Sequence, residues 1–216
     1  VPPTPAVPPP DVPAASPEQK IDPETADIWV DGETVSCRRF TYVLLHKPAG
    51  VLSAVEDSRQ RTVLDLLPQE LKRQGLSPVG RLDKDTEGLL LLTDDGELTH
   101  RLLSPKYHVD KVYYARVDGV PDAADAAAFA AGLLLGDGLQ CLPAKLELLG
   151  GDACLVTLRE GKFHQVKRML ASRGKPVLYL KRLAMGPLTL EDTLPAGQCR
   201  PLTEEEISAL RCACGV

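Results

Sequence analysis

An arginine and a carboxylate two positions apart, Arg81 and Asp83, lie in a polar turn that leads directly into the apolar run 89–92. This run is too short for a typical helix and glycine precedes it, so it predicts a buried strand. A carboxylate at the mouth of a buried strand is well placed to act as a nucleophile when a neighbouring cation holds it ionised. We therefore take Asp83 as the candidate catalytic residue.

The same turn has two other interpretations. Its acidic residues and a glycine match five positions of a calcium loop: Asp83, Asp85, Glu87, Gly88 and Asp94. Calcium loops lie between two amphipathic helices, whereas here leucines fill the second half of the loop, so we expect no metal site. An acidic turn with a purely structural role stays open as an alternative.

A helix predicted at 163–172 offers a candidate partner for Asp83. The 3.6-residue period puts three side chains on an apolar face, with Met169 at its margin: Phe163, Val166 and Leu170. The other faces present His164, Lys167 and Arg168. Because Lys167 and Arg168 are adjacent, they point in different directions, so one can pair with Asp83 while the other meets a phosphate. His164 is expected to be a packing or phosphate contact rather than a base.

The strand predicted at 111–117 places Tyr113 and Tyr114 on opposite faces. One ring is therefore expected in the core, while the other can lie against a flat substrate. Stacking on an aromatic ring is a common way to hold a nucleobase that has been flipped out of its helix.

The charge is strongly polarised along the chain. The net charge is −5, yet the segment from Arg159 to Arg182 has eight cations against one carboxylate, a local charge of +7 that leaves −12 for the rest. A basic segment of this kind is suited to a phosphate-facing surface. Its candidate RNA-binding residues are Lys162, His164, Arg168 and Arg182. A solvated helix face is the alternative, and charge alone does not decide between the two.

The composition is typical of a globular protein with a core. The chain has 216 residues, of which 44% are apolar, and its apolar runs are far too short to span a membrane. The N-terminus lacks a signal-peptide pattern, and the six cysteines include no C-x-x-C pair. We expect a cytoplasmic protein with reduced thiols and no membrane contact, with Cys154 in the core and Cys212 and Cys214 in a loose tail.

Three segments are predicted along the chain. Residues 1–25 are proline-rich and are expected to be flexible, because they cannot bury enough apolar surface to fold. Residues 26–41 contain a short strand closed by a turn at Asp31–Gly32. In residues 42–216, strands are predicted at 42–46, 111–117, 146–149, 153–158 and 177–183, with a turn and strand at 79–93. Helices are predicted at 62–67, 97–103, 121–135, 163–172 and 203–210. This order indicates an α+β fold around a mixed, largely antiparallel sheet.

Three motifs, in this order, resemble those of the RsuA/RluB/E/F-type pseudouridine synthases. They are Gly80-Arg81-Leu82-Asp83, the Lys-x-Tyr of 111–113, and the stretch EGKFHQVKRM at 160–169. The similarity extends from about residue 26 to residue 207 and includes HKPAG at 46–50. The form HQVKRM is most like the family's small-subunit enzyme.

The resemblance implies a fold, an activity and residue roles. The fold would be a mixed sheet with flanking helices and a central basic cleft, and the activity would be isomerisation of a single uridine, uridine 516 of 16S rRNA, to pseudouridine. Asp83 matches the aspartate that attacks the uridine, and Tyr113 the tyrosine that stacks on its base. Lys167 matches the cation paired with the aspartate. Arg81 resembles the arginine that fills the gap left by the flipped nucleotide.

No metal or organic cofactor is implied by the resemblance. The expected partner is 16S rRNA or a small-subunit assembly intermediate, bound by a monomer. The alternatives are a 23S rRNA target, or a non-catalytic RNA-binding module of ribosome assembly. Family members usually carry a complete N-terminal S4 RNA-binding domain. Only its last strand, near 28–35, is recognisable here, so residues 26–41 are interpreted as an S4-like remnant and a linker.

Overall fold

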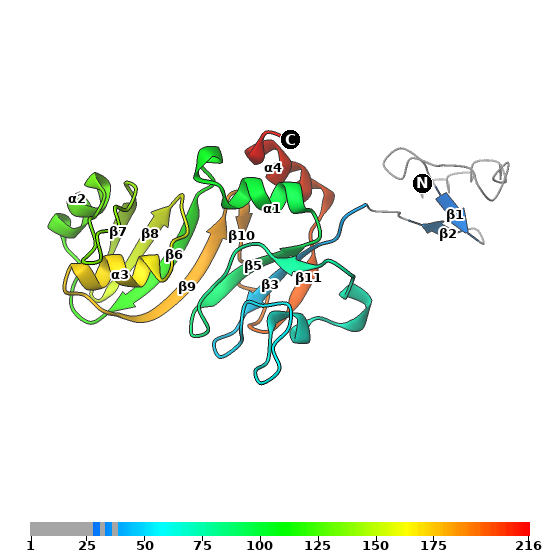
Figure 1. Cartoon of the computed structure of the whole chain (residues 1–216), viewed down its shortest axis with the longest axis horizontal. Helices are drawn as coiled ribbons and strands as arrows, with labels where there is room; N and C mark the ends of the chain where they lie inside the picture. Colours follow the sequence, from blue (N-terminus) through cyan, green and yellow to red (C-terminus); the bar gives the residue numbers. More distant parts are fainter. Residues whose placement is uncertain (1–27, 31–32, 36–38) are drawn as a thin grey trace, which may run out of the picture. The chain divides into compact units, whose positions relative to one another are not determined.

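The structure is a computed structural model that describes residues 28–30, 33–35 and 39–216. Residues 40–216 form one compact unit. Strands β1 (Ile28–Val30) and β2 (Glu33–Val35) belong to a separate unit, in which they pair antiparallel (Figure 1). The predicted proline-rich segment 1–25 and the Asp31–Gly32 turn lie outside the described residues.

A nine-stranded sheet runs through residues 40–216 (Figure 1). Its strands are β3 (Tyr42–Lys47), β4 (Ser77–Pro78), β5 (Glu87–Thr93), β6 (Lys111–Val117), β7 (Lys145–Gly150), β8 (Ala153–Leu158), β9 (Val177–Met185), β10 (Leu188–Thr189) and β11 (Cys199–Pro201). The main path is β11-β3-β5-β9-β6-β8-β7, with β4 on β5 and β10 on β9. Only β5 and β9 pair parallel among the described strands, so the predicted α+β fold with a largely antiparallel, mixed sheet is confirmed.

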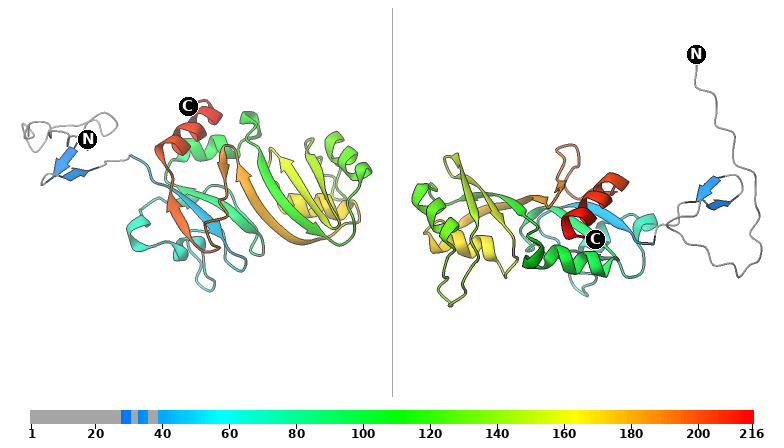
Figure 2. Two further views of the ribbon diagram at one scale, coloured as in Figure 1. Left: turned by 180° about the vertical axis from the view of Figure 1, so that it is seen from behind. Right: turned by 90° about the horizontal axis from the view of Figure 1, so that it is seen from above.

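Helices pack against both faces of the sheet. They are α1 (Gly96–Leu103), α2 (Ala123–Ala131), α3 (Gln165–Ser172) and α4 (Glu204–Cys214). Alternate residues of β3 and β5 enter two different cores, one completed by α2 and α3 and the other by α1 and α4. The continuous leucine run of β5 is therefore buried on both sides, as its sequence predicts. Figure 2 shows α4 beside α1 from two further directions.

Local signals explain where the helices begin and end. A capping box opens α4, where the Thr203 side chain accepts from the Glu206 amide and the Glu206 side chain accepts from the Thr203 amide. Helix α2 is shorter than the predicted 121–135. It ends at Gly132, whose φ of 81° and whose approach to the Cys141 carbonyl leave no room for a side chain. No helix in the described ranges is long and apolar enough to cross a membrane.

Two further sequence predictions near helix ends are wrong. Helix α3 begins at Gln165 rather than at Phe163, because His164 adopts a left-handed conformation with φ of 49°. Phe163 therefore lies outside the helix and is 75% exposed instead of in the core. Cys214 is not in a loose tail: it is buried in the last turn of α4, and its carbonyl accepts a hydrogen bond from Arg101.

Candidate active site

The loop that carries Asp83 is tied to its surroundings through its backbone. Ser53 Oγ donates to the Leu82 carbonyl at 2.9 Å and accepts from the Leu82 amide at 3.1 Å. The Thr86 amide donates to the Asp83 carbonyl at 3.1 Å, which closes a turn directly before β5. The buried strand thus begins at Glu87, and Asp83 is held just outside it with a side chain that is 24% exposed.

Lys47, at the end of β3, lies beneath this loop and is completely buried. Its ammonium group donates to four backbone carbonyls at 2.8–3.3 Å: those of Pro48, Asp83, Lys84 and Thr86. Burial lowers the pKa of Lys47 to about 8. The sequence motif HKPAG was recognised only as part of the family resemblance, so this role of Lys47 was not predicted. The feature that could have indicated it is a lysine next to a proline at the end of an otherwise apolar strand.

Helix α3 brings Lys167 to Asp83. Lys167 Nζ lies 3.0 Å from Asp83 Oδ2 and 2.6 Å from Asp85 Oδ1, because Val166, Met169 and Leu170 bury the opposite side of the helix. Burial acts against the charge on Lys167, but its hydrogen bonds to Asp85 and Asp83 outweigh this, so its pKa is raised above the ordinary value. Met169, which was expected at the margin of the apolar face of this helix, is fully buried in the core.

The loop before α3 brings His164 to the other oxygen of the same carboxylate. His164 Nε2 lies 3.4 Å from Asp83 Oδ1. The loop is fixed by the buried Glu160, which accepts from Gln165 Nε2 at 2.5 Å, and by the Lys162 amide, which donates to Gln165 Oε1 at 2.9 Å. Asp83 is therefore flanked by a lysine and an imidazole whose positions are set by α3.

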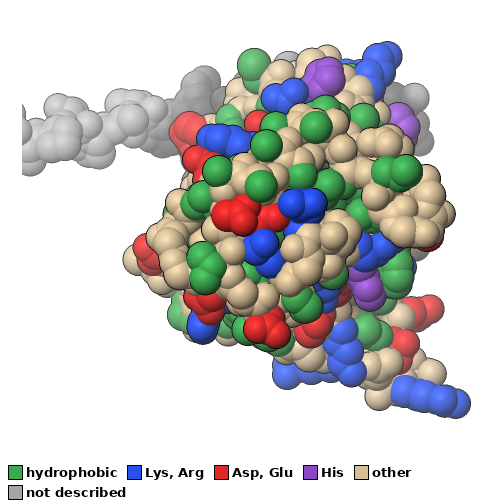
Figure 3. Space-filling view, turned by 90° about the vertical axis from the view of Figure 1, so that its left-hand side faces the viewer, with side chains coloured by type: hydrophobic (Ala, Val, Ile, Leu, Met, Phe, Trp, Pro, Cys, Tyr) green, Lys and Arg blue, Asp and Glu red, His purple; other side chains and the backbone are tan. Residues whose placement is uncertain are grey.

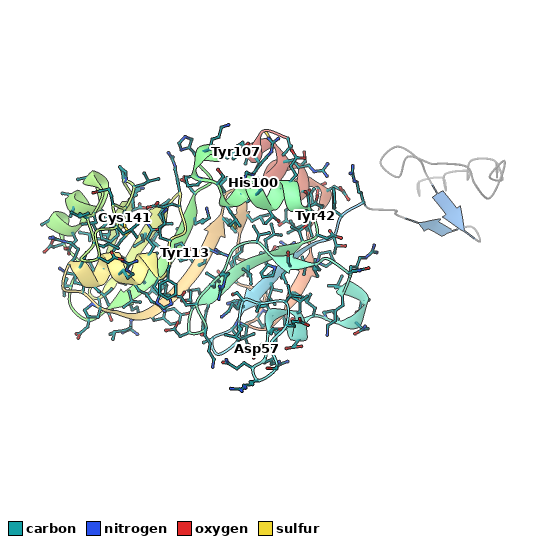
Figure 4. All side chains as sticks on the ribbon, viewed as in Figure 1. Tyr42, Asp57, His100, Tyr107, Tyr113 and Cys141 are labelled. Atoms are coloured by element: carbon teal, nitrogen blue, oxygen red, sulfur yellow. The ribbon has the colours of Figure 1, made fainter. Side chains whose placement is uncertain are left out.

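Tyr113 and Asp83 line the same small cavity of about 70 Å³. Tyr113 lies on β6, is 8% exposed and is labelled beside α3 in Figure 4. Apolar side chains complete the wall, namely Leu158, Val166 and Leu180. Tyr114 points to the opposite face of the sheet, where its ring meets Tyr179 edge to face. The cavity thus places an aromatic ring and a carboxylate around one pocket.

The calcium-loop interpretation is not supported by the geometry. Asp83 and Asp85 share Lys167, while Glu87 accepts a hydrogen bond from Tyr179 at 2.8 Å. Asp94 follows the far end of β5 and accepts from the Thr41 amide. The five matching positions are therefore spread along a strand and do not converge on one point.

Most cations of the basic segment are neutralised by carboxylates from elsewhere in the chain. Five of its eight cations form ion pairs: Arg159 with Asp110, Lys167 with Asp83 and Asp85, Arg168 with Asp137, and Arg173 and Lys175 with Asp125. Figure 3 shows basic and acidic side chains interspersed on the end of the molecule that carries α2 and α3. The basic cleft implied by the resemblance stays a prediction.

The remaining candidate RNA-binding residues differ in exposure. Arg81 and Lys162 are exposed, and both border the cavity at Asp83. Arg182 is only 2% exposed, and its Nε donates to the Leu89 carbonyl at 2.7 Å. It lies in the interior beneath the site, which disfavours a direct contact, and its assignment as an RNA contact stays a prediction.

Known proteins are similar to this chain over most of its sequence. The family model of RNA pseudouridylate synthase matches residues 41–172. An uncharacterized RNA pseudouridine synthase, YtzG of Bacillus subtilis, is 47% identical over 92% of this chain and 84% of that protein. Ribosomal small subunit pseudouridine synthase A of Vibrio cholerae is 42% identical over 87% of this chain and 81% of that protein.

A crystal structure of a pseudouridylate synthase is similar throughout the fold. It has a TM-score of 0.74 and 37% sequence identity, and the similarity covers 90% of this chain and 84% of that chain. The family match spans more than half of the sequence, and the similarity covers 84% and 81% of the two relatives named above. The chain therefore belongs to the RNA pseudouridine synthases of the RsuA type, isomerases that act on uridine in RNA.

Proposed function

We propose that this protein converts a single uridine of 16S small-subunit rRNA to pseudouridine, with Asp83 as the attacking carboxylate. The observation that carries this proposal is the placement of Asp83 on Lys167 at the edge of a cavity walled by Tyr113. A carboxylate nucleophile must be held facing its target, and the Lys167 ammonium group at 3.0 Å fixes the position of Asp83 Oδ2.

The reaction rearranges the substrate and exchanges one proton with the solvent. Asp83 attacks the sugar C1′ and forms an ester bond to it as the bond between C1′ and the base N1 breaks. The detached base turns, and its C5 attacks C1′, which displaces the Asp83 carboxylate. C5 then gives up its proton to the solvent or to a base, and N1 takes up one proton from the solvent. Tyr113 would hold the base by stacking while it is detached from the sugar, and Arg81 would fill the space left in the RNA.

The choice of RNA is supported by relatives rather than by the cavity, because every uridine offers the same edge. The relatives from Vibrio cholerae and Pseudomonas aeruginosa, at 42% and 46% identity, are both named ribosomal small subunit pseudouridine synthase A. These names support 16S rRNA as the target. The proposal of uridine 516, modified in the cytoplasm, rests on the family resemblance of the sequence motifs.

Mapping of pseudouridine by carbodiimide treatment and primer extension tests this assignment. Purified protein is incubated with unmodified 16S rRNA, 23S rRNA and small-subunit assembly particles. We expect one new stop, at uridine 516 of 16S rRNA or of the particle. A new stop in 23S rRNA alone would show that the chemistry is right and the target wrong.

A further inference from the structure

Phe163 and His164 form a stack of two rings at the rim of the site. Their ring centroids are 3.8 Å apart and their planes differ by 19°. Phe163 is 75% exposed, more than any other large apolar side chain in the described part of the chain. It is exposed because the left-handed backbone at His164 turns the chain before α3 begins.

The exposed ring borders a second, larger cavity of about 480 Å³. This cavity shares several lining residues with the small one at Tyr113: Arg81, Leu82, Asp83, Gly161, Lys162 and His164. Leu103 and the buried Lys111 form other parts of its wall. The space in front of Phe163 is therefore continuous with the surroundings of the attacking carboxylate.

We propose that Phe163 stacks on a nucleobase next to the target uridine in the RNA, an inference that rests on the proposed function. His164 covers one face of the Phe163 ring, so the ring has one face left for a single base. The exposed cations Arg81 and Lys162 border the same cavity and suit the phosphates on either side of that base. A nucleobase in RNA has both features that this site suits: a flat ring, and a negatively charged phosphate on each side.

Stacking of Phe163 on a neighbouring base would stabilise the flipped state of the target uridine. Extracting a uridine breaks its stacking with both neighbours, and this loss opposes the flipped state. A protein ring that stacks on one neighbour restores part of what was lost. Because His164 also contacts Asp83 at 3.4 Å, the base on Phe163 is held at a fixed distance from the reacting group.

The test uses three substitutions of Phe163, whose exposed side chain lies outside the core. Phe163→Ala removes the ring, Phe163→Leu keeps apolar bulk, and Phe163→Trp keeps a stacking surface. Leu178→Ala is the matched control, since Leu178 is 66% exposed on β9 and lies outside both cavities. Unchanged urea midpoints establish that all four variants fold.

Affinity is measured for a short 16S stem-loop that contains the target, with 2-aminopurine placed in turn on each side of it. Phe163→Ala and Phe163→Leu should weaken binding by about 5- to 150-fold, the range for loss of one base stacked on an aromatic ring. Phe163→Trp and Leu178→Ala should bind within about 2-fold of the unchanged protein. Fluorescence at one of the two flanking positions should be quenched by Phe163 or Trp and not by Ala or Leu.

Two results would overturn the inference. One is binding by Phe163→Ala equal to that of the unchanged protein, with the same fluorescence. The other is an effect seen only on assembly particles and not on naked RNA, which would assign the ring to a ribosomal protein. Release of tritium from C5 of the target separates this inference from the proposed function. Release by the unchanged protein with no effect at Phe163 refutes only the stacking, whereas no release by the unchanged protein refutes the function.

Discussion

At the scale of single residues, the site depends on one lysine between two carboxylates. Lys167 contacts Asp85 at 2.6 Å and Asp83 at 3.0 Å, and Lys167 in turn lowers the pKa of Asp85 through a hydrogen bond. Without this cation the two carboxylates would repel each other. Lys167 therefore holds both carboxylates in place and keeps Asp83 from turning away from Asp85.

Lys167→Met should slow turnover by about 100-fold or more, the usual cost of removing a charged group that acts on the reacting atoms. Arg168→Met should stay within about 3-fold, because Arg168 pairs with Asp137 and not with Asp83. Single-turnover rates of tritium release at saturating protein measure both. Equal losses for the two variants would contradict the assignment of Lys167 to the site.

The sequence narrowed the partner of Asp83 to two residues. Because Lys167 and Arg168 are adjacent, they had to point in different directions, and the resemblance selected Lys167. The structure puts only Lys167 on Asp83. Phe163 was placed in the core because the helical period was extended across His164. The backbone of His164 is left-handed, and the sequence does not predict this conformation for a histidine. Lys47 was missed because a buried cation is identified by its carbonyl partners, which come from residues far along the chain.

At the scale of elements, the end of β3 positions the loop before β5. Lys47→Met should lower the free energy of unfolding by about 3 kcal/mol or more, because several buried carbonyls lose a charged donor at once. Turnover should fall as well, since the same carbonyls belong to the loop of Asp83. Urea unfolding and tritium release measure the two effects.

The matched control for Lys47→Met is Lys84→Met, in the same loop. Lys84 is exposed and its ammonium group donates to the Gln60 side chain rather than to buried carbonyls. Its substitution should change stability by less than about 0.5 kcal/mol, as at other surface positions. A small effect of Lys47→Met, similar to that of the control, would show that the loop holds its shape without the buried lysine.

The start of β6 carries a second buried lysine with a clear dependence on pH. Burial lowers the pKa of Lys111 to about 8 from an ordinary 10.5, and its ammonium group donates to the Leu102 and Val109 carbonyls. The folded state thus binds fewer protons than the unfolded chain between these pH values. The cost of burying the charge is complete below pH 8 and is relieved as the pH rises.

The stability of the unchanged protein relative to Lys111→Met should therefore rise by about 1 kcal/mol between pH 7 and pH 9. Urea unfolding of both proteins at each pH measures it. The difference between the two proteins cancels the contributions of all other titrating groups, because both proteins contain them. A relative stability that is constant, or that falls with pH, would contradict the burial of a charged lysine here.

Elements with local signals were predicted closely. Strand β6 has the predicted bounds 111–117, and the strands predicted at 146–149 and 153–158 are β7 and β8, which pair antiparallel. The parallel pairing of β5 with β9 joins Glu87 to Lys181, far apart in the sequence, and no local pattern specifies it. The end of α2 was missed because Gly132 is required by contact with the Cys141 carbonyl and not by the alanine-rich sequence.

At the scale of the whole molecule, a count of charge along the sequence overestimates the surface offered to RNA. Five of the eight cations between Arg159 and Arg182 are ion-paired with carboxylates brought by the fold, and Arg182 is buried. The exposed cations that line the cavities at Asp83 are Arg81, Lys84 and Lys162. Only about three phosphate contacts are therefore expected from the site.

The affinity for a 16S stem-loop should depend on salt with a log–log slope of about 2, from about three contacts at roughly 0.7 each. Fluorescence anisotropy between about 50 and 300 mM KCl measures it. Arg81→Met should reduce the slope, whereas Arg173→Met, whose charge is paired with Asp125, should not. A slope near 6 would mean that the whole basic segment faces the RNA.

The release of tritium from 16S rRNA labelled at C5 of uridine tests the central claim most directly, with the unchanged protein and Asp83→Asn compared side by side. Asparagine has nearly the same size as aspartate and cannot carry the charge that Lys167 pairs with at 3.0 Å. The unchanged protein should release one equivalent of tritium per rRNA, and Asp83→Asn should release none while it folds and binds RNA normally. Release by Asp83→Asn at a rate near that of the unchanged protein would contradict the account.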